Sequence, residues 1–335
     1  MTRFGERAAR WGLGLVLGGL GLQALRLALH KAFSIDEFQY AHAAWLVSRG
    51  QVPYRDFFEV HLPLVYQVLA PLFLVLGDEP LNVLALRGAM LVPLAGACVA
   101  VAVLNRREGR GVALLAPVLL LALPPFMHFA TEVRPDALAT ALFLGALATL
   151  SVRPATPARA FSAGALLVAS VWGSQKVLFF GGIVGSALAA DLVLRRGRAP
   201  ALVPAPRAFL AGAFVVLAAV ASYLTVSGSW AAWWQWCFVW ASEHQRHYPG
   251  FSSSKYLLPV LEAQPWCFTL AALGFAASVR RWWRSGRARW SDPDVLLLLA
   301  VPATFRLVRA PARTVSLQPA AVPRRARALH GAWRG

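Results

Sequence analysis

Long apolar segments alternate with short polar ones over most of this 335-residue chain. A helix needs roughly 20 apolar residues to cross the hydrocarbon core of a membrane. The sequence therefore predicts a series of membrane-spanning helices joined by polar connections. We expect these spans at 11–29, 82–104, 111–130, 136–152, 160–174, 177–194, 208–226 and 265–279, with a shorter apolar run at 294–305.

The apolar run 62–77 is short and contains Pro63 and Pro71. If it does not cross the membrane, 17 Lys and Arg residues lie in loops on the side of the N-terminus and seven lie opposite. If it crosses, the two counts are exchanged. Because cytoplasmic loops carry the excess of Lys and Arg, we interpret 62–77 as a re-entrant or interfacial helix. The N-terminus is then cytoplasmic, and the first external loop, 30–81, contains juxtamembrane helices.

The composition supports a membrane protein. It is 58% hydrophobic and 14% charged, which is too apolar for an ordinary soluble domain. The net charge of +18 does not indicate nucleic-acid binding, because the basic residues fall in short clusters between apolar segments. The three cysteines show no metal-ligand spacing, and no cofactor is expected. We infer an all-α polytopic membrane protein, with about eight transmembrane helices plus a partial ninth.

The segment 305–335 differs from the rest of the chain. It has seven Arg residues, no acidic residue and scattered prolines, and the apolar run before it is too short for a full span. We expect a transmembrane module at 1–304. The tail at 305–335 is expected to be disordered, or to result from a truncation or a shift of the reading frame.

Acidic residues concentrate on the predicted external side, which holds ten of the 15. Asp36 and Glu37 directly follow the first span. A carboxylate at the membrane surface is partly desolvated, which suits a general base. The same sequence also fits an ordinary helix start, with Ser34 or Asp36 as the N-cap residue and Glu37 in the first turn. The two interpretations are compatible.

A second candidate lies further along the same loop. Gly50 is expected to end a helix, and Pro53 forces an extended turn that presents Tyr54 and Asp56. A plain turn between two interfacial helices explains these residues equally well.

Arg134 and Asp136 flank Pro135 at the expected start of a span. Proline suits the first helical turn, and an aspartate there is stabilised by the helix dipole. The functional alternative is a phosphate site, because helix N-termini and arginines both bind phosphate. Lys176, in a short external turn, either adds a second positive charge to this site or anchors its helix at the interface.

A tryptophan-rich segment precedes the last predicted span. Its spacing is typical of an interfacial helix in an aromatic belt, and stacking on a sugar or a lipid tail is the alternative. The residues are Trp230, Trp233, Trp234, Trp236 and Trp240.

The first external loop carries a recognisable set of positions: Asp36, Glu37, Tyr40, Ala44, Leu46, Gly50, Pro53, Tyr54, Asp56, His61, Pro63 and Tyr66. This set resembles the first loop of the C-type (GT-C) integral-membrane glycosyltransferases that use polyprenyl-phosphate sugars. That group includes protein O-mannosyltransferases, the lipid A aminoarabinose transferase and lipopolysaccharide-core galacturonosyltransferases. Arg134-Pro135-Asp136 and Lys176 extend the resemblance, which covers roughly 11–280. Family members are longer and have more spans.

The resemblance implies an inverting transfer of a sugar from a polyprenyl-phosphate donor to a hydroxyl or amine of an acceptor. The acceptor would be lipid A or lipopolysaccharide, another glycan, or a protein, and the enzyme would lie in the bacterial inner (plasma) membrane with its active site facing outward. Asp36 maps onto the catalytic base of the family, and Glu37 onto the second position of its acidic pair. The expected substrate-binding residues are Arg134, Asp136, Lys176, Tyr54, Asp56 and His61.

Two other functions stay open at this stage. One is an inactive, truncated remnant of such an enzyme. The other is a transporter or flippase, a class that places charges deep within its spans and often shows internal repeats. Here the only Lys or Arg residues within predicted spans are Arg26 and Arg87, and no repeat is found.

Overall fold

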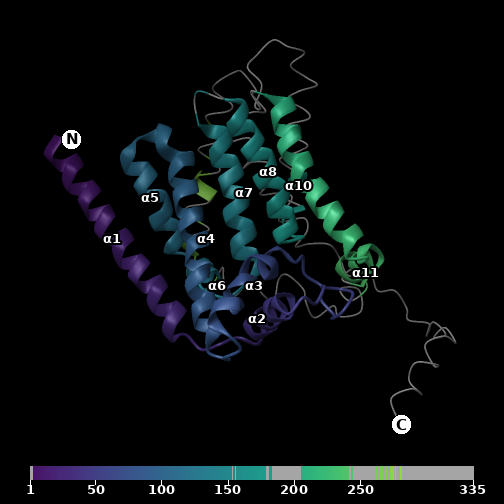
Figure 1. Cartoon of the computed structure of the whole chain (residues 1–335). Helices are drawn as coiled ribbons and strands as arrows, with labels where there is room; N and C mark the ends of the chain where they lie inside the picture. The colour runs from purple at the N-terminus through teal and green to yellow at the C-terminus, as the bar shows by residue number, and fades with distance from the viewer. Residues whose placement is uncertain are drawn as a thin grey trace, which may run out of the picture.

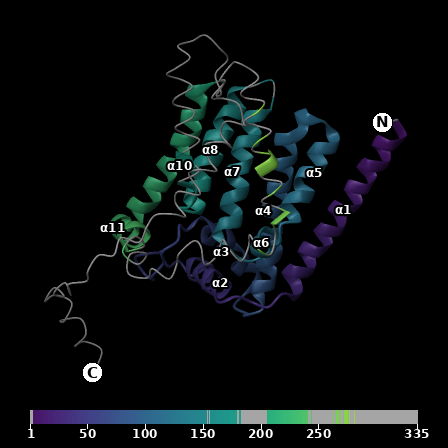
Figure 2. The ribbon, with the colours of Figure 1, turned by 180° about the vertical axis from the view of Figure 1, so that it is seen from behind.

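A computed structural model describes residues 3–152, 154, 156–178, 181–182 and 205–240, together with scattered positions between 243 and 280. The described residues form helices and no strand, as expected for an all-α protein. Figure 1 shows a bundle of helices with shorter helices gathered at one end, and Figure 2 shows the same arrangement from behind.

Six of the described helices run along the bundle: α1 (Arg3–His30), α4 (Asn82–Asn105), α5 (Arg110–Leu121), α7 (Pro135–Ser151), α8 (Pro157–Gly173) and α10 (Pro206–Val226). The shorter elements lie at the end of the bundle where α1 finishes, which we call the α2 end (Figure 1). They are α2 (Ile35–Ser48), α3 (Leu64–Leu76), α6 (Pro124–Ala130), α11 (Trp230–Trp234) and the π-helical turn Gln235–Trp240. A 3₁₀ turn, Arg106–Glu108, joins α4 to α5 at the opposite end.

Among the described residues, three helices are long and apolar enough to cross a membrane, and a fourth is added if α5 and α6 form one bent span. The same part of the chain contains two shorter apolar helices. The chain is therefore compatible with a membrane protein. The described residues do not establish the larger number of spans predicted from the sequence. The three long helices are Arg7–His30, Asn82–Glu108 and Pro206–Val226, and the two shorter ones are Leu64–Leu76 and Pro135–Ser151.

Some sequence predictions fall on other parts of the chain. The expected spans at 177–194 and 265–279 lie largely outside the described residues, and the apolar run 294–305 and the tail 305–335 lie wholly outside them.

The apolar run 62–77 contains α3, and the helices on either side of its loop meet at one end of the bundle. Arg87 of α4 donates hydrogen bonds to the carbonyl oxygens of Ala28 (3.2 Å) and Lys31 (2.8 Å), at the end of α1. The end of α1 and the first part of α4 therefore lie together. The segment between them, which contains α2 and α3, leaves and returns at the α2 end of the bundle.

The segment 111–130, which was expected to form one span, is bent between α5 and α6. The axes of α5 and α6 differ by 74°. Leu123 has an extended backbone (φ −77°, ψ 105°) because the residue before a proline, here Pro124, avoids the helical region. The bend brings the last turn of α6 to the α2 end, where the carbonyl oxygen of His128 accepts a hydrogen bond from Lys31 (2.7 Å).

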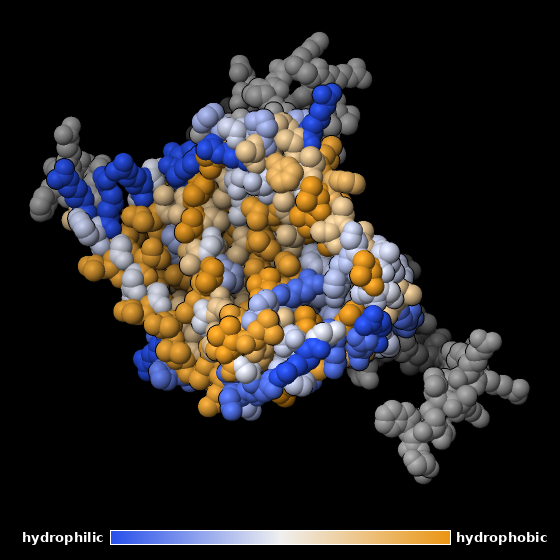
Figure 3. Space-filling view, viewed as in Figure 1, coloured by the Kyte–Doolittle hydropathy of each residue, from blue (hydrophilic) through white to orange (hydrophobic). Residues whose placement is uncertain are grey.

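Hydrophobic side chains cover much of the visible flank of the bundle, and hydrophilic side chains gather at its two ends (Figure 3). Several large apolar residues of the bundle helices are strongly exposed, as expected for helices that face lipid. Among them are Trp11 and Leu15 of α1 and Leu210 and Phe214 of α10.

Helices α8 and α10 pack with almost no space between their backbones at two glycines. A Cβ added to Gly164 would collide with the carbonyl group of Phe209, and one added to Gly212 would collide with that of Phe161. Small residues allow such close contact between membrane helices.

We expect Gly164→Ala to lower the free energy of unfolding by about 1–3 kcal/mol, because the added methyl group overpacks this crossing. The measurement is thermal unfolding of the purified protein in detergent.

The matched control is Gly96→Ala in α4, where an added Cβ meets nothing within 4 Å. Alanine is the better helix former, so this variant should be as stable as wild type or slightly more stable. Equal stability of the Gly164→Ala and Gly96→Ala variants would contradict the close crossing.

Candidate functional site

The first turn of α2 is fixed by reciprocal capping hydrogen bonds. The backbone amide of Glu37 donates to Oγ of Ser34 (3.3 Å), and the amide of Ser34 donates to Oε2 of Glu37 (3.1 Å). Ser34 is therefore the N-cap residue, one of the two alternatives that the sequence allowed. Asp36 and Glu37 are consecutive in the helix and so project in different directions.

Glu37 projects inward and forms a buried ion pair with Arg87. The Nε and Nη2 atoms of Arg87 donate to the two carboxylate oxygens at 2.7 and 2.6 Å, and both side chains have no exposed surface. The amide of Val133 donates to the same carboxylate at 3.2 Å. Burial alone would raise the pKa of Glu37, but these hydrogen bonds outweigh it and leave the pKa below its ordinary value. Glu37 thus holds α2 against α4 and the segment that leads into α7.

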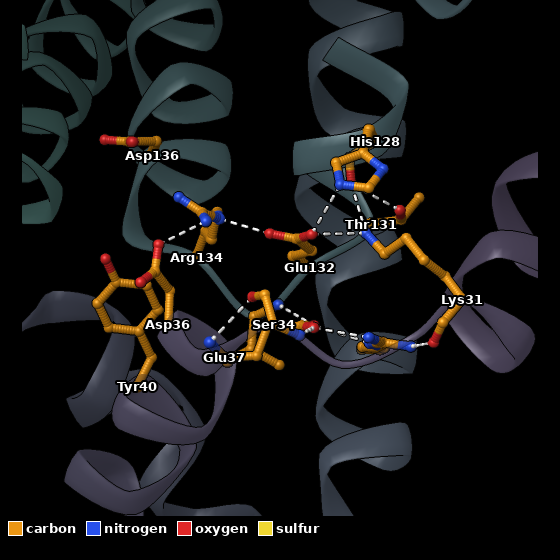
Figure 4. A network of polar contacts seen from close by, with 12 residues as sticks. Lys31, Ser34, Asp36, Glu37, Tyr40, His128, Thr131, Glu132, Arg134 and Asp136 are labelled. Carbon is orange, nitrogen blue, oxygen red and sulfur yellow. Dashed lines mark hydrogen bonds and ion pairs between the residues drawn. The ribbon is translucent and has the colours of Figure 1, made fainter. Parts of the chain in front are cut away.

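Asp36 projects outward and meets Arg134 at the start of α7. Nη2 of Arg134 donates to Oδ2 of Asp36 at 2.6 Å, and its Nε donates to Oε2 of Glu132 at 2.5 Å. The other oxygen of Glu132 accepts from Nζ of Lys31 at 2.9 Å and lies 3.1 Å from Nε2 of His128. Figure 4 shows this chain of alternating charges.

The middle of this chain is buried, and Asp36 and His128 at its two ends are about half exposed. The exposed fraction of the side chain is 2% for Glu132, 8% for Lys31, 18% for Arg134 and 48% for Asp36. Burial by itself would lower the pKa of Arg134, but the adjacent Glu132 carboxylate raises it above its ordinary value. The guanidinium therefore stays charged, and Asp36 is its exposed partner, within reach of a ligand.

A second ion pair lies beside the first. Lys176, after α8, donates to Oδ2 of Asp136 at 2.6 Å, and the hydroxyl of Ser174 donates to the other oxygen at 2.9 Å. Asp136 is two residues after Arg134, so the two ion pairs share the first turn of α7. Four of the predicted site residues are thus brought together from α2, α7 and the end of α8.

His61 approaches the same region from the first loop. Its Nδ1 lies 2.8 Å from Oε1 of Glu59, which also accepts from the backbone amides of Val60 (2.8 Å) and His61 (3.0 Å). Glu59 is buried. When the imidazole of His61 carries its proton on Nδ1, its Nε2 atom can accept a hydrogen bond from the hydroxyl of Tyr40, which lies 3.4 Å away. Burial and the nearby charge of Asp36 raise the pKa of Tyr40, so it remains a neutral hydroxyl group.

Tyr54 and Asp56 shape the loop that carries His61. Tyr54 has a left-handed backbone (φ +72°), which is uncommon for a residue with a side chain, and its hydroxyl donates to the carbonyl oxygen of His61 at 2.7 Å. The carboxylate of Asp56 accepts from the amide of Val52 (2.8 Å) and from the guanidinium of Arg55 (2.8 and 2.9 Å). The hydrogen bonds to Arg55 and Val52 lower the pKa of Asp56 to about 2. Both residues therefore stabilise the turn.

The tryptophan-rich segment is helical, and it changes from an α-helix to a π-helix after Trp234. It comprises the short α11 followed by the π-helical turn Gln235–Trp240. Phe58 of the first loop packs edge-on against Trp236 and Trp240, with ring centroids 4.9 and 5.5 Å apart. The segment therefore packs against the loop that carries Tyr54 and His61.

Sequence reasoning did not select several residues that the site uses. Glu132 orients Arg134, Lys31 pairs with Glu132, and Glu59 orients His61. Only Glu132 could have been predicted from the local sequence, since it lies two residues before Arg134. Among the described residues, no three His, Cys, Asp or Glu side chains are grouped so as to hold a metal ion.

Comparisons of this chain with protein-family models, with curated proteins and with solved structures give no match. A function must therefore rest on the chemistry of the residues at the α2 end.

Proposed function

We propose that this protein is a membrane glycosyltransferase that moves a sugar from polyprenyl phosphate to an acceptor outside the cytoplasm. The acceptor is lipid A or lipopolysaccharide, another glycan, or a protein. The enzyme resides in the bacterial inner membrane with a cytoplasmic N-terminus. The observation that carries the proposal is the contact between Asp36 and Arg134, which are 98 positions apart in the sequence and meet at 2.6 Å.

Asp36 is the proposed base. Its side chain is 48% exposed, so an acceptor hydroxyl or amine can approach it. Asp36 takes the acceptor proton while the acceptor atom bonds to the anomeric carbon of the sugar, and the bond from that carbon to the phosphate oxygen breaks. The electron pair of that bond leaves with the phosphate. Because the acceptor attacks opposite the leaving group, the anomeric configuration is inverted.

Arg134 and Lys176 are the proposed partners of the phosphate. The donor phosphodiester carries one negative charge, and the phosphate monoester that leaves carries close to two. Cations near the leaving oxygen therefore stabilise the transition state more than the bound donor. Outside the cytoplasm there is no pool of nucleotide sugars, so a lipid-linked donor, delivered along the apolar flank of the bundle, fits this site.

His61 is proposed to bind the sugar. Its side chain is 29% exposed, and its Nε2 atom lies 3.4 Å from the hydroxyl of the buried Tyr40. Glu59 fixes the orientation of the His61 imidazole, and a fixed donor or acceptor costs less entropy when it binds a sugar hydroxyl.

The test is the release of polyprenyl phosphate by purified protein, with a panel of polyprenyl-phosphate sugars and acceptors. We expect Arg134→Gln to lower kcat/KM by about 10²–10³-fold, because it removes a cation that faces the developing charge. Lys176→Gln should have a smaller effect, because its side chain is 68% exposed and so better screened by water.

Arg49→Gln is the matched control. Arg49 lies at the same end of the bundle but pairs with Asp78, outside the site, and should be replaceable without loss of activity. Absence of turnover with every donor, by folded wild-type protein, would refute the proposed function.

A further inference from the structure

Both cations that are proposed to bind the donor phosphate are already paired with carboxylates of the same chain. Arg134 binds Asp36 at 2.6 Å, and Lys176 binds Asp136 at 2.6 Å. A phosphate that binds either cation would lie next to a carboxylate, which is also negatively charged. While both ion pairs persist, these carboxylates repel the donor phosphate and neutralise part of the charge of each cation.

The partners of these cations differ in burial. Glu132, which binds Nε of Arg134, is 2% exposed and is also held by Lys31. Asp36 and Asp136 are 48% and 38% exposed. Water can solvate the two exposed carboxylates when they leave, whereas release of Glu132 would strand a buried charge. Glu132 thus keeps Arg134 in place, and the exchangeable partners are Asp36 and Asp136.

The strengths of the competing interactions favour replacement of the Asp36 and Asp136 carboxylates by the donor phosphate. Partly exposed ion pairs between side chains are weak, of the order of 1 kcal/mol or less. Hydrogen bonds from a guanidinium to phosphate are charge-assisted and can be bidentate. A donor anchored by its lipid tail in the adjacent membrane also has a high local concentration at this end of the bundle.

We propose that Asp36 and Asp136 act as internal competitors of the donor phosphate, so that donor binding releases Asp36 from Arg134 and makes it available as the base. This inference rests on the proposed function and adds to it an order of substrate binding. The donor binds first, and the acceptor loses its proton only when a donor is in place. The ligand is a lipid-linked phosphate.

The experiment measures binding of polyprenyl phosphate, without a sugar, to protein in nanodiscs by native mass spectrometry or thermophoresis. Asp36→Asn removes the competing charge but keeps the shape of the side chain. We expect it to bind polyprenyl phosphate about two- to tenfold more tightly than wild type, the range that corresponds to loss of a partly exposed ion pair. Asp136→Asn should change affinity in the same direction.

Asp78→Asn is the control for net charge, since it removes one exposed carboxylate from the same end of the bundle and should leave the affinity unchanged. Tighter binding by Asp36→Asn but not by Asp78→Asn supports the competition. Equal or weaker binding by Asp36→Asn, with wild type still binding, overturns the competition and leaves the proposed function standing. If neither wild type nor the variants bind, the proposed function itself fails. Displacement by millimolar inorganic phosphate would overturn the assignment to a lipid-linked ligand.

Discussion

Replacement of Asp36 by asparagine is expected to lower the rate of sugar transfer by about 10²–10⁴-fold, the usual contribution of a general base. Asparagine has the same shape as aspartate but cannot accept the acceptor proton. Asp36 is partly exposed and takes no part in the capping hydrogen bonds between Ser34 and Glu37, so the amount and melting temperature of the inserted protein should not change. The measurement is kcat under saturating donor.

Asp78→Asn serves as the control, because it removes a carboxylate at the same end of the bundle that binds only Trp45 and Arg49 among the described contacts. Its activity should equal that of wild type. An Asp36→Asn variant with the activity of this control would exclude Asp36 as the base.

The largest expected effect on stability comes from Arg87. Arg87→Met keeps much of the side-chain volume but leaves the Glu37 carboxylate buried without its cation. It also removes the hydrogen bonds to the carbonyl oxygens of Ala28, Lys31 and Ala32. We expect the free energy of unfolding to fall by about 3–5 kcal/mol, measured by chemical unfolding in detergent.

Two further variants separate the buried charge from other effects. Arg49→Met breaks an exposed ion pair at the same end of the bundle and should have no measurable effect. The double variant Arg87→Met with Glu37→Gln should recover part of the lost stability, since the unpaired charge is gone. A single Arg87→Met variant as stable as Arg49→Met would show that the pair does not hold α2 to α4.

The local parts of the fold were accessible from the sequence because their causes are local. Ser34 and Glu37 have the spacing of a capping box, and both side chains form it. Proline at the start of α7 and α8 occupies the first helical turn, where its missing amide costs nothing. The break between α5 and α6 was also encoded, by Pro124, but hydrophobicity alone suggested one continuous span.

The pairs of charged residues within the site could not be predicted from the local sequence. Lys31 and Glu132 are 101 positions apart, and Arg87 and Glu37 are 50 apart. Nothing in either local sequence indicates which distant charge is the partner, since that depends on how α1, α4 and α7 pack. Arg87 was recognised only as a charge inside a predicted span, although such a charge requires a buried partner.

The resemblance of the first loop to C-type glycosyltransferases grouped residues whose roles differ in the structure. Asp36 faces the proposed substrate side, whereas Glu37 and Asp56 are occupied by hydrogen bonds that stabilise α2 and the turn after it. A pattern of residue types does not distinguish a carboxylate that holds the backbone from one that meets a substrate. The direction in which each side chain points makes this distinction.

The most direct test of a base-assisted, single-step transfer is the anomeric configuration of the product. Purified wild-type protein would be supplied with a polyprenyl-phosphate sugar of one defined anomer and a mixture of acceptors, and the product would be examined by NMR. Direct attack by an acceptor that Asp36 deprotonates predicts a product of inverted configuration, together with one released polyprenyl phosphate for each sugar transferred. A product of retained configuration would contradict this mechanism.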